Sequence, residues 1–172
     1  MWFRRDLRLA DNPALLAALS DAADTRVVPL FVLDPALSRP AGAARRAYLK
    51  ASLTDLGMRV GGLQLRRGDP VREVVEVARA AHASTVHVAE DFGPHGRQRD
   101  LDVEAELARH GLSLSRTGSP SAVPPGRAGH KTGRPYQAST PSSPARPDPC
   151  RAPPTRRPPP RPPAPHAARP PT

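Results

Sequence analysis

The stretch that decides the fold is the first fourteen residues, Met1 to Ala14, which read MWFRRDLRLADNPA. Aromatic residues open it, three arginines and an aspartate follow, and an Asp-Asn-Pro turn closes it. Asp11-Asn12 supplies a helix cap, and Pro13 suits a first helical turn, where its missing N–H is not needed. The stretch therefore predicts a short strand over residues 1–4, a charged loop, and a helix from Pro13 to about Ala23.

Strand and helix signals alternate along the next part of the chain. Val27–Leu33 (VVPLFVL) is a continuous apolar run, typical of a strand buried on both faces, and Pro29 puts full pairing just after itself. The same patterns predict later helices at 43–58, 70–81 and 96–109 and later strands at 63–66, 85–89 and 112–115. Such alternation with short loops predicts an α/β fold, a doubly wound five-stranded parallel sheet with right-handed crossovers.

Charge and proline divide the chain into two unlike parts. Residues 1–116 hold 17 Lys and Arg against 15 Asp and Glu, and residues 117–172 hold 9 against 1. Beyond Tyr136 there is no Val, Ile, Leu, Met, Phe, Trp or Tyr, so the segment cannot bury enough apolar surface to offset its ordering entropy. We expect a folded domain over 1–117, an extended linker over 118–137 and a disordered Pro/Arg/Ala-rich tail over 138–172.

Several classes of function lack their sequence signals. The single cysteine, Cys150, makes no internal disulfide or metal site, and the scattered histidines lack metal-ligand spacing. No Gly-rich dinucleotide or P-loop motif follows a strand, and no arrangement of nucleophile, base and acid stands out. No apolar run reaches the ~20 residues of a membrane span. We expect a cytoplasmic monomer without membrane association, metal or catalytic residues of its own.

Charged segments follow the first two predicted strands, at the edge of the sheet where doubly wound folds bind ligands. Arg5 offers a guanidinium fork to an anionic or carbonyl-bearing ligand. The alternative is that Asp6 pairs with the neighbouring arginines and fixes the loop. Asp34 ends the second strand and could accept hydrogen bonds from a ligand; alternatively it starts a turn before Pro35.

A third segment, Glu90–Asp100 (EDFGPHGRQRD), follows the fourth strand. Phe92 can pack against a planar heterocycle, Asp91 can orient it, and a helix N-terminus points at it. The alternative is helix capping, with Arg97 and Arg99 solvated. The candidate cofactor-binding residues are Arg5, Asp34, Asp91, Phe92 and Arg97.

The pattern Trp-Phe-Arg-Arg-Asp-Leu-Arg-Leu-x-Asp-Asn resembles the opening of the DNA photolyase/cryptochrome family. The likeness covers about residues 2–137 and includes Leu30–Pro35, Arg67–Pro70 and Gly133–Tyr136. It implies strand order 3-2-1-4-5 and an N-terminal antenna domain. In that family an all-helical domain further along the chain binds FAD and damaged DNA, and we expect that domain to be missing here.

The segment Asp91–Asp100 resembles Asp-x-x-Pro-Tyr-Gly-Arg-x-Arg-Asp of photolyases with a deazaflavin antenna, with His95 in place of the aromatic. Photolyases with a folate antenna tend to have Asn-Glu near this point. The likeness therefore favours 8-hydroxy-5-deazaflavin over methenyltetrahydrofolate as antenna chromophore. It is closest to the class I photolyases of cyclobutane pyrimidine dimers.

After Pro135-Tyr136 the family continues with aromatic residues, whereas this chain reads Gln-Ala-Ser-Thr-Pro from Gln137. We expect that a frameshift after about residue 137 replaced the FAD domain, and that apolar residues preceding Trp2 are clipped. The implied function is the antenna domain of a deoxyribodipyrimidine photolyase-like protein, inactive alone. The alternatives are a fragment of a cryptochrome-type blue-light photoreceptor and a stand-alone nucleotide- or cofactor-binding α/β module.

Overall fold

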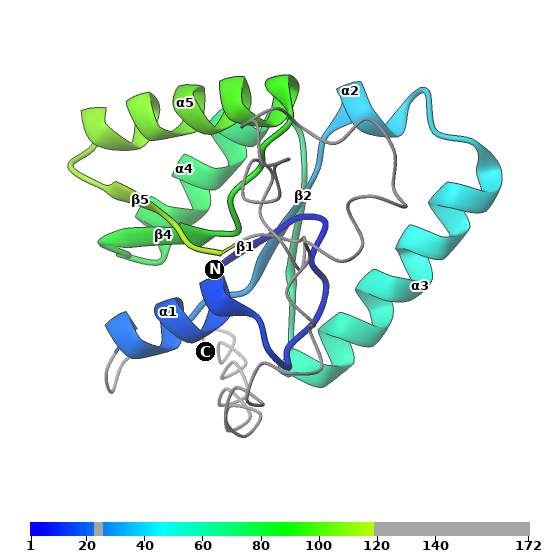
Figure 1. Ribbon diagram of the computed structural model, residues 1–172, viewed down its shortest axis with the longest axis horizontal. Helices are drawn as coiled ribbons and strands as arrows, with labels where there is room; N and C mark the ends of the chain where they lie inside the picture. The colour runs from blue at the N-terminus through cyan, green and yellow to red at the C-terminus, as the bar shows by residue number, and fades with distance from the viewer. Residues whose placement is uncertain (23–25, 119–172) are drawn as a thin grey trace, which may run out of the picture.

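The computed structural model describes residues 1–22 and 26–118, and within them strands and helices alternate (Figure 1). In chain order the elements are β1 (Trp2–Phe3), α1 (Pro13–Ala22), β2 (Leu30–Leu33), α2 (Pro35–Ser38), α3 (Ala43–Val60), β3 (Gln64–Arg67), α4 (Pro70–Ala80), β4 (Thr85–Val88), α5 (Pro94–Arg109) and β5 (Ser113–Arg116). The predicted α/β class is confirmed.

Every strand pairing in the described residues is parallel. β2 lies between β1 and β3, with Trp2 opposite Leu30 and Phe31 opposite Leu65. β4 pairs with β5 in a separate two-stranded sheet. Within each sheet the strands have the neighbours that the expected order requires. The expected pairing between β1 and β4 is absent from the ladders of the described residues, so the two sheets are separate. The complete order 3-2-1-4-5 therefore stays a prediction.

The core has two layers, one on each face of the strands. Trp2, Leu30 and Val32 face α4 and α5, where they pack with the fully buried Val74, Val103 and Leu107. Phe3 and Phe31 point to the opposite face and pack against α1 and α3 through Leu15, Leu53 and Leu56. Neighbouring strand residues thus point to opposite faces, and both faces are apolar, as a doubly wound sheet requires.

Most helix boundaries follow the local signals in the sequence. The Asn12 Oδ1 accepts the Leu15 N–H at 3.1 Å, so Asn12 caps α1 just before Pro13. Gly61 ends α3 with a left-handed φ of 75°, which costs glycine little. Asp69 caps α4, its carboxylate accepting the Val71 N–H at 3.1 Å.

One element differs from the expectations: the short helix α2 was not expected, and it forms because Asp34 caps a turn that begins with Pro35. The paired strand β2 begins at Leu30, directly after Pro29, as expected. β3 is exposed along its whole length because it is an edge strand.

The expected linker and tail, residues 118–172, lie outside the described residues except for Gly118. None of the described helices combines the length and the hydrophobicity that crossing a membrane requires.

Candidate functional site

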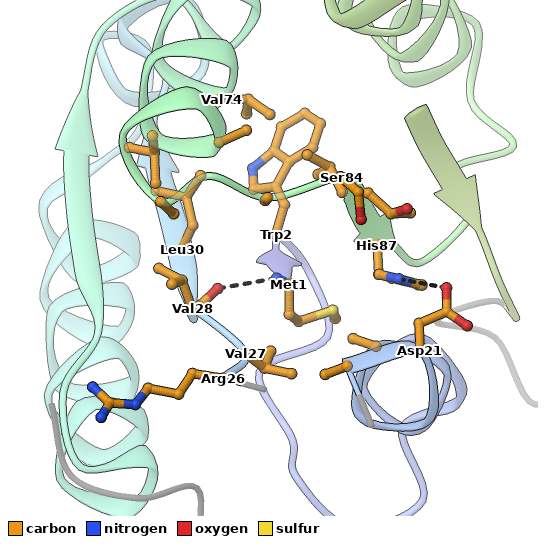
Figure 2. A pocket seen from close by; sticks show the side chains of 18 of the residues that line it. Met1, Trp2, Asp21, Arg26, Val27, Val28, Leu30, Val74, Ser84 and His87 are labelled. Atoms are coloured by element: carbon orange, nitrogen blue, oxygen red, sulfur yellow. Dashed lines mark hydrogen bonds and ion pairs between the residues drawn. The ribbon is translucent and has the colours of Figure 1, made fainter. Parts of the chain in front are cut away.

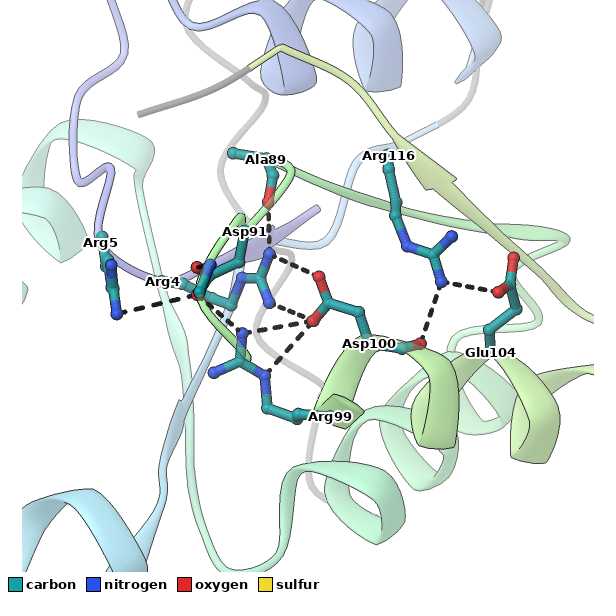
Figure 3. A network of polar contacts seen from close by, with 9 residues as sticks. Arg4, Arg5, Ala89, Asp91, Arg99, Asp100, Glu104 and Arg116 are labelled. Atoms are coloured by element: carbon teal, nitrogen blue, oxygen red, sulfur yellow. Dashed lines mark hydrogen bonds and ion pairs between the residues drawn. The ribbon is translucent and has the colours of Figure 1, made fainter. Parts of the chain in front are cut away.

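The carboxyl ends of β1 and β4 are joined by a network of charged side chains, shown in Figure 3. At its centre Arg4 forms an ion pair with Asp100 of α5 and donates to the carbonyl of Ala89, just beyond β4. The Arg4 side chain is only 10% exposed and that of Asp100 only 3%. A buried charge is tolerated when it is paired and hydrogen-bonded, and Arg4 is both.

Arg99 extends this network toward the loop after β4. Its guanidinium lies 3.3 Å from the Asp100 carboxylate and 3.4 Å from the carboxylate of Asp91. Arg4 and Arg99 also lie over the Trp2 ring, at 4.9 and 5.3 Å from its centroid. Two cations on one buried indole add cation–π attraction to the ion pairs.

A second arginine contact reaches the same helix from β5. Arg116 donates to the Asp100 carbonyl at 3.2 Å and to the Glu104 carboxylate at 2.6 Å. α5 is thus held by arginines from both β1 and β5. The arrangement fixes the position of α5 against the strand ends.

Burial and charge shift two pKa values within this network. Burial lowers the pKa of Arg4, and Asp100 opposes the shift by accepting a hydrogen bond from the guanidinium. For Asp91, burial acts to raise the pKa, but the Gly93 N–H and the nearby arginines outweigh it, and the pKa falls below its ordinary value. The Asp91 carboxylate is therefore held ionised.

Asp91 is bonded within the loop after β4, and Arg5 lies beside it. Asp91 accepts the Gly93 N–H at 3.1 Å and packs over Gly96, where a Cβ atom would clash with its carboxylate. Arg5 lies 3.9 Å from the same carboxylate, but its side chain is 72% exposed. Asp91 already has hydrogen-bond and ion-pair partners within the chain, whereas most of the Arg5 side chain faces solvent.

The other three candidate residues are less closely connected. The Asp34 carboxylate accepts the Ala36 N–H at 2.7 Å as the cap of α2, in line with the turn alternative. Arg97 lies 5.9 Å from the centroid of the Phe92 ring and is exposed. The predicted interaction of Asp6 with a neighbouring arginine is present, at 3.4 Å from Arg8, although one Asp6 oxygen is buried without a partner.

The space at this edge is small. A cavity lined by residues 1–6 and 89–91 measures about 10 Å³, which holds on the order of one water molecule. A planar heterocycle therefore does not fit inside the network. Arg5 and Arg97 are exposed and Phe92 is half-buried in the two segments that carry this network, and these three residues are here called the edge surface. Within the described residues no group of three His, Cys, Asp or Glu side chains could hold a metal ion.

Sequence reasoning selected Arg5 and missed Arg4, Arg99 and Asp100 as the connected residues. A signal was available, because Arg4 follows Trp2 at the strand period of two and so points toward the face covered by α5. The acidic partner could not be found this way, since Asp100 lies 96 residues further along the chain.

The geometry defines a doubly wound α/β domain whose strand ends are closed by an arginine–aspartate network and flanked by an open aromatic and basic surface. The chain belongs to the DNA photolyase family, since the model of that family matches residues 1–163. The match runs past residue 137, where we expect a frameshift, and the frameshift stays a prediction.

Named relatives agree with this assignment. The deoxyribodipyrimidine photo-lyase of Streptomyces griseus is 41% identical over 118 residues, which are 65% of this chain and 26% of that protein. A class III photolyase structure from Agrobacterium tumefaciens is 31% identical with a TM-score of 0.71, covering 81% of this chain and 29% of that one. An archaeal photolyase structure from Sulfolobus tokodaii with two FAD molecules is 26% identical with a TM-score of 0.63, covering 72% of this chain and 29% of that one.

The chain spans between 26% and 51% of the length of the first curated relatives. The likeness therefore concerns the N-terminal α/β domain of these proteins. It does not separate class I from the other photolyase classes.

Proposed function

We propose that this chain is the antenna-chromophore domain of a deoxyribodipyrimidine photolyase-like protein, whose family reaction is the light-driven repair of pyrimidine dimers in DNA. The observation that carries the proposal is the family match over residues 1–163, together with a Streptomyces griseus relative that bears the photo-lyase name. The cryptochrome-fragment and stand-alone-module alternatives are not favoured by these findings.

The edge surface is the proposed place for the pigment. Phe92 offers an aromatic face, and the exposed guanidiniums of Arg5 and Arg97 offer donors to carbonyl or anionic groups. Asp91 contributes by fixing the loop that carries Phe92, because its own carboxylate is already occupied. The surface supplies one wall, so we expect a further protein segment or domain to cover the pigment.

The pigment we propose is 8-hydroxy-5-deazaflavin, on the likeness of Asp91–Asp100 to the photolyases that carry it. Repair itself would require an FAD-binding domain, which would also contact the damaged DNA. In this proposal the chain contributes no catalytic residue and no lesion contact. Its part is to hold the pigment at a fixed place on the α/β domain.

A binding titration tests the pigment site. Purified chain is titrated with 8-hydroxy-5-deazaflavin and, separately, with methenyltetrahydrofolate and FAD, while pigment fluorescence anisotropy is recorded. We expect the deazaflavin to bind most tightly and the Phe92→Ala variant to bind at least about fivefold more weakly, since a ring stacked on a pigment contributes ~1–3 kcal/mol. Leu101→Ala is the control, because Leu101 is an exposed apolar residue of α5 outside the edge surface.

Equal binding by the Phe92→Ala variant would contradict the proposed site, and tighter binding of FAD or folate would contradict the proposed pigment. Catalysis is tested separately by survival of a photolyase-deficient strain after ultraviolet damage and light. We expect no rescue by this chain alone. Clear rescue would show that the chain is an enzyme and overturn the proposed division of roles.

A further inference from the structure

Charge is unevenly distributed along the described part of the chain. Residues 35–68, which form α2, α3 and β3, hold seven Lys and Arg against a single acid. Residues 69–118, which form α4, β4, α5 and β5, hold six Lys and Arg against nine Asp and Glu. The helices α3 and α5 cover opposite faces of the strands (Figure 1). The side of the molecule formed by α3 and β3 is therefore the basic one.

β3 is an edge strand, and one side of its backbone has no partner strand within the described residues. Gln64 donates its N–H to the Pro29 carbonyl at 2.9 Å and so faces β2. Successive residues of a strand direct their backbone groups to alternate sides. The N–H and C=O groups of Leu65 and Arg67 therefore face outward, where they can bond a further strand.

Two side chains of β3 point to the face of the sheet that α3 covers. Leu65 lies opposite Phe31 and Arg67 lies opposite Leu33, and both partners belong to the core layer beneath α1 and α3. Residues paired directly across a ladder point to the same face. Leu65 is 51% exposed, and Arg67 is exposed as well. The open edge thus presents an apolar contact and a cation on this face.

α3 adds a cation beside the same edge. A Cβ atom at Gly57 would lie 3.7 Å from the Leu63 Cβ atom, so this flank of α3 faces the segment that leads into β3. Lys50 lies about two helical turns before Gly57 and shares its flank. The helix rise puts Lys50 about 10 Å from Gly57, and the strand rise puts Arg67 about 13 Å from Leu63. Since a crossover helix runs opposite to the strands that it joins, Lys50 and Arg67 lie at similar heights.

These cations have no acidic partner among the described residues. Asp55, the acid nearest to Lys50 in the sequence, pairs instead with Arg59 at 3.6 Å. Arg66 points to the other face of β3 and adds a third positive charge to the open edge. Arginines on an edge strand oppose pairing with basic strands and attract acidic ones.

Charge also decides between the possible occupants of this edge. Two copies of the chain paired through β3 would bring Arg66 and Arg67 of each copy close together, and like charges in neighbouring strands are destabilising. Residues 117–172 of the chain hold nine Lys and Arg against one acid, so they carry the wrong charge. The favoured occupant is an acidic segment of another protein.

We propose that the open edge of β3 binds an extended acidic segment of a partner protein by strand addition. The backbone of the segment bonds the outward groups of Leu65 and Arg67, an apolar side chain covers Leu65, and acidic side chains meet Lys50, Arg66 and Arg67. This site is separate from the edge surface, because β2 lies between β3 and β1. It does not depend on the proposed pigment.

A designed peptide serves as the probe. Fluorescein-labelled Glu-Glu-Val-Thr-Val-Glu-Glu reads the same in both directions, so in either orientation a valine meets Leu65 when glutamates meet Arg66 and Arg67. The control peptide Glu-Glu-Pro-Thr-Pro-Glu-Glu keeps the charge but lacks two donors of a paired strand. We expect the full chain to bind the first peptide at least about fivefold more tightly, measured by fluorescence anisotropy. Equal binding of the two peptides would overturn the proposal.

Three variants locate the charges that matter. Arg67→Gln and Lys50→Gln should each weaken binding of the first peptide about threefold, since each removes one exposed ion pair. Arg79→Gln is the matched control, because Arg79 is an exposed arginine of α4 on the other face of the strands. Equal affinities of all three variants and the unchanged chain would contradict the assigned site.

Hydrogen exchange shows where the peptide lies. Saturating peptide should slow exchange at the Leu65 and Arg67 amides at least about tenfold. The Gly68 amide should not change, because it already donates to the Leu33 carbonyl at 3.2 Å. A short DNA duplex is the rival occupant of a basic surface. Protection of the Leu65 and Arg67 amides by the duplex and not by the peptide would overturn the proposal, and so would protection by neither.

Discussion

The carboxyl and amino edges of the strands differ in how they connect the β1–β2–β3 sheet to the β4–β5 sheet. At the carboxyl edge, side chains connect β1 to the β4–β5 sheet, because Arg4 reaches both Ala89 and Asp100. At the amino edge no such connection exists among the described residues, and a cavity of about 560 Å³, here called the amino-edge cavity, lies in its place (Figure 2). The comparison shows that buried charges join the two sheets at one end of the strands, in addition to the apolar core that both sheets share beneath α4 and α5.

The two edges also differ in how many partners their buried charged groups have. The arginines of the carboxyl edge meet carboxylates and a carbonyl at hydrogen-bond distance. The ammonium of Met1 has a single carbonyl partner among the described residues, that of Val28 at 3.0 Å. The two edges should therefore respond oppositely to the removal of a charge, which destabilises the first and stabilises the second.

The largest effect is expected from Asp100→Asn, which leaves Arg4 and Arg99 buried without their shared carboxylate. Breaking one side of a buried ion pair costs about 3–5 kcal/mol of unfolding free energy. Urea unfolding measures it. Asp102→Asn is the control on the same helix, because Asp102 is exposed and, within the described part of the chain, accepts a hydrogen bond from Gln98 at 2.9 Å. A loss below about 1 kcal/mol for Asp100→Asn would show that the network does not hold the sheets together.

The amino edge should make stability depend on pH. The Met1 amino group has an ordinary pKa of 8.0, and burial lowers this pKa to about 5 in the folded state, so between these values the unfolded chain holds a proton that the folded chain lacks. Unfolding free energy should therefore rise between pH 5 and pH 8, by up to about 4 kcal/mol. His87 acts in the same direction, since burial lowers its pKa, with Asp21 opposing and the ammonium adding to the shift.

Acetylation of the Met1 nitrogen removes this charge and provides the control. We expect the acetylated chain to keep only the smaller His87 contribution to the slope between pH 5 and pH 8, measured by urea unfolding. Identical slopes for the free and acetylated chains would mean that the ammonium is not buried.

A smaller effect is expected from Gly96→Ala at the carboxyl edge. The new Cβ atom would displace the Asp91 carboxylate from its place over α5. Overpacking costs about 1–3 kcal/mol, against a gain of about 1 kcal/mol in helix propensity, so a net loss on the order of 1 kcal/mol is expected. Gly57→Ala is the matched control inside a helix, since a Cβ atom there meets only the Leu63 Cβ atom, at an ordinary contact distance of 3.7 Å. A more stable Gly96→Ala protein would contradict the packing of Asp91.

The smallest effect is expected from Arg5→Gln. The pair with Asp91 is long, at 3.9 Å, and the Arg5 side chain is 72% exposed, so its loss should cost less than about 0.5 kcal/mol. Arg99→Gln, which removes a buried partner of the same carboxylate, should cost clearly more. Equal costs in chemical unfolding would place Arg5 inside the network rather than on the edge surface.

Much of the fold could be predicted from local signals, because caps and apolar runs act over a few residues. Asn12, Asp69 and Gly61 each lie at a helix end, where residues of their type are favoured. The site was harder, because Arg4, Arg5 and Arg8 look alike in sequence and differ only in what the fold places beside them. The pairing of Arg4 with Asp100 is long-range, and the amino-edge cavity has no sequence motif, since it arises from the spacing of strands.

Trp2 has one more consequence for the molecule. It is the only tryptophan of the chain, it is 3% exposed, and it lines both the small cavity and the amino-edge cavity. Its indole lies beneath the guanidiniums of Arg4 and Arg99 and above the opening beside Met1. The fluorescence of Trp2 should therefore respond to changes at both the carboxyl and the amino edge of the strands, and one emission spectrum monitors the two edges together.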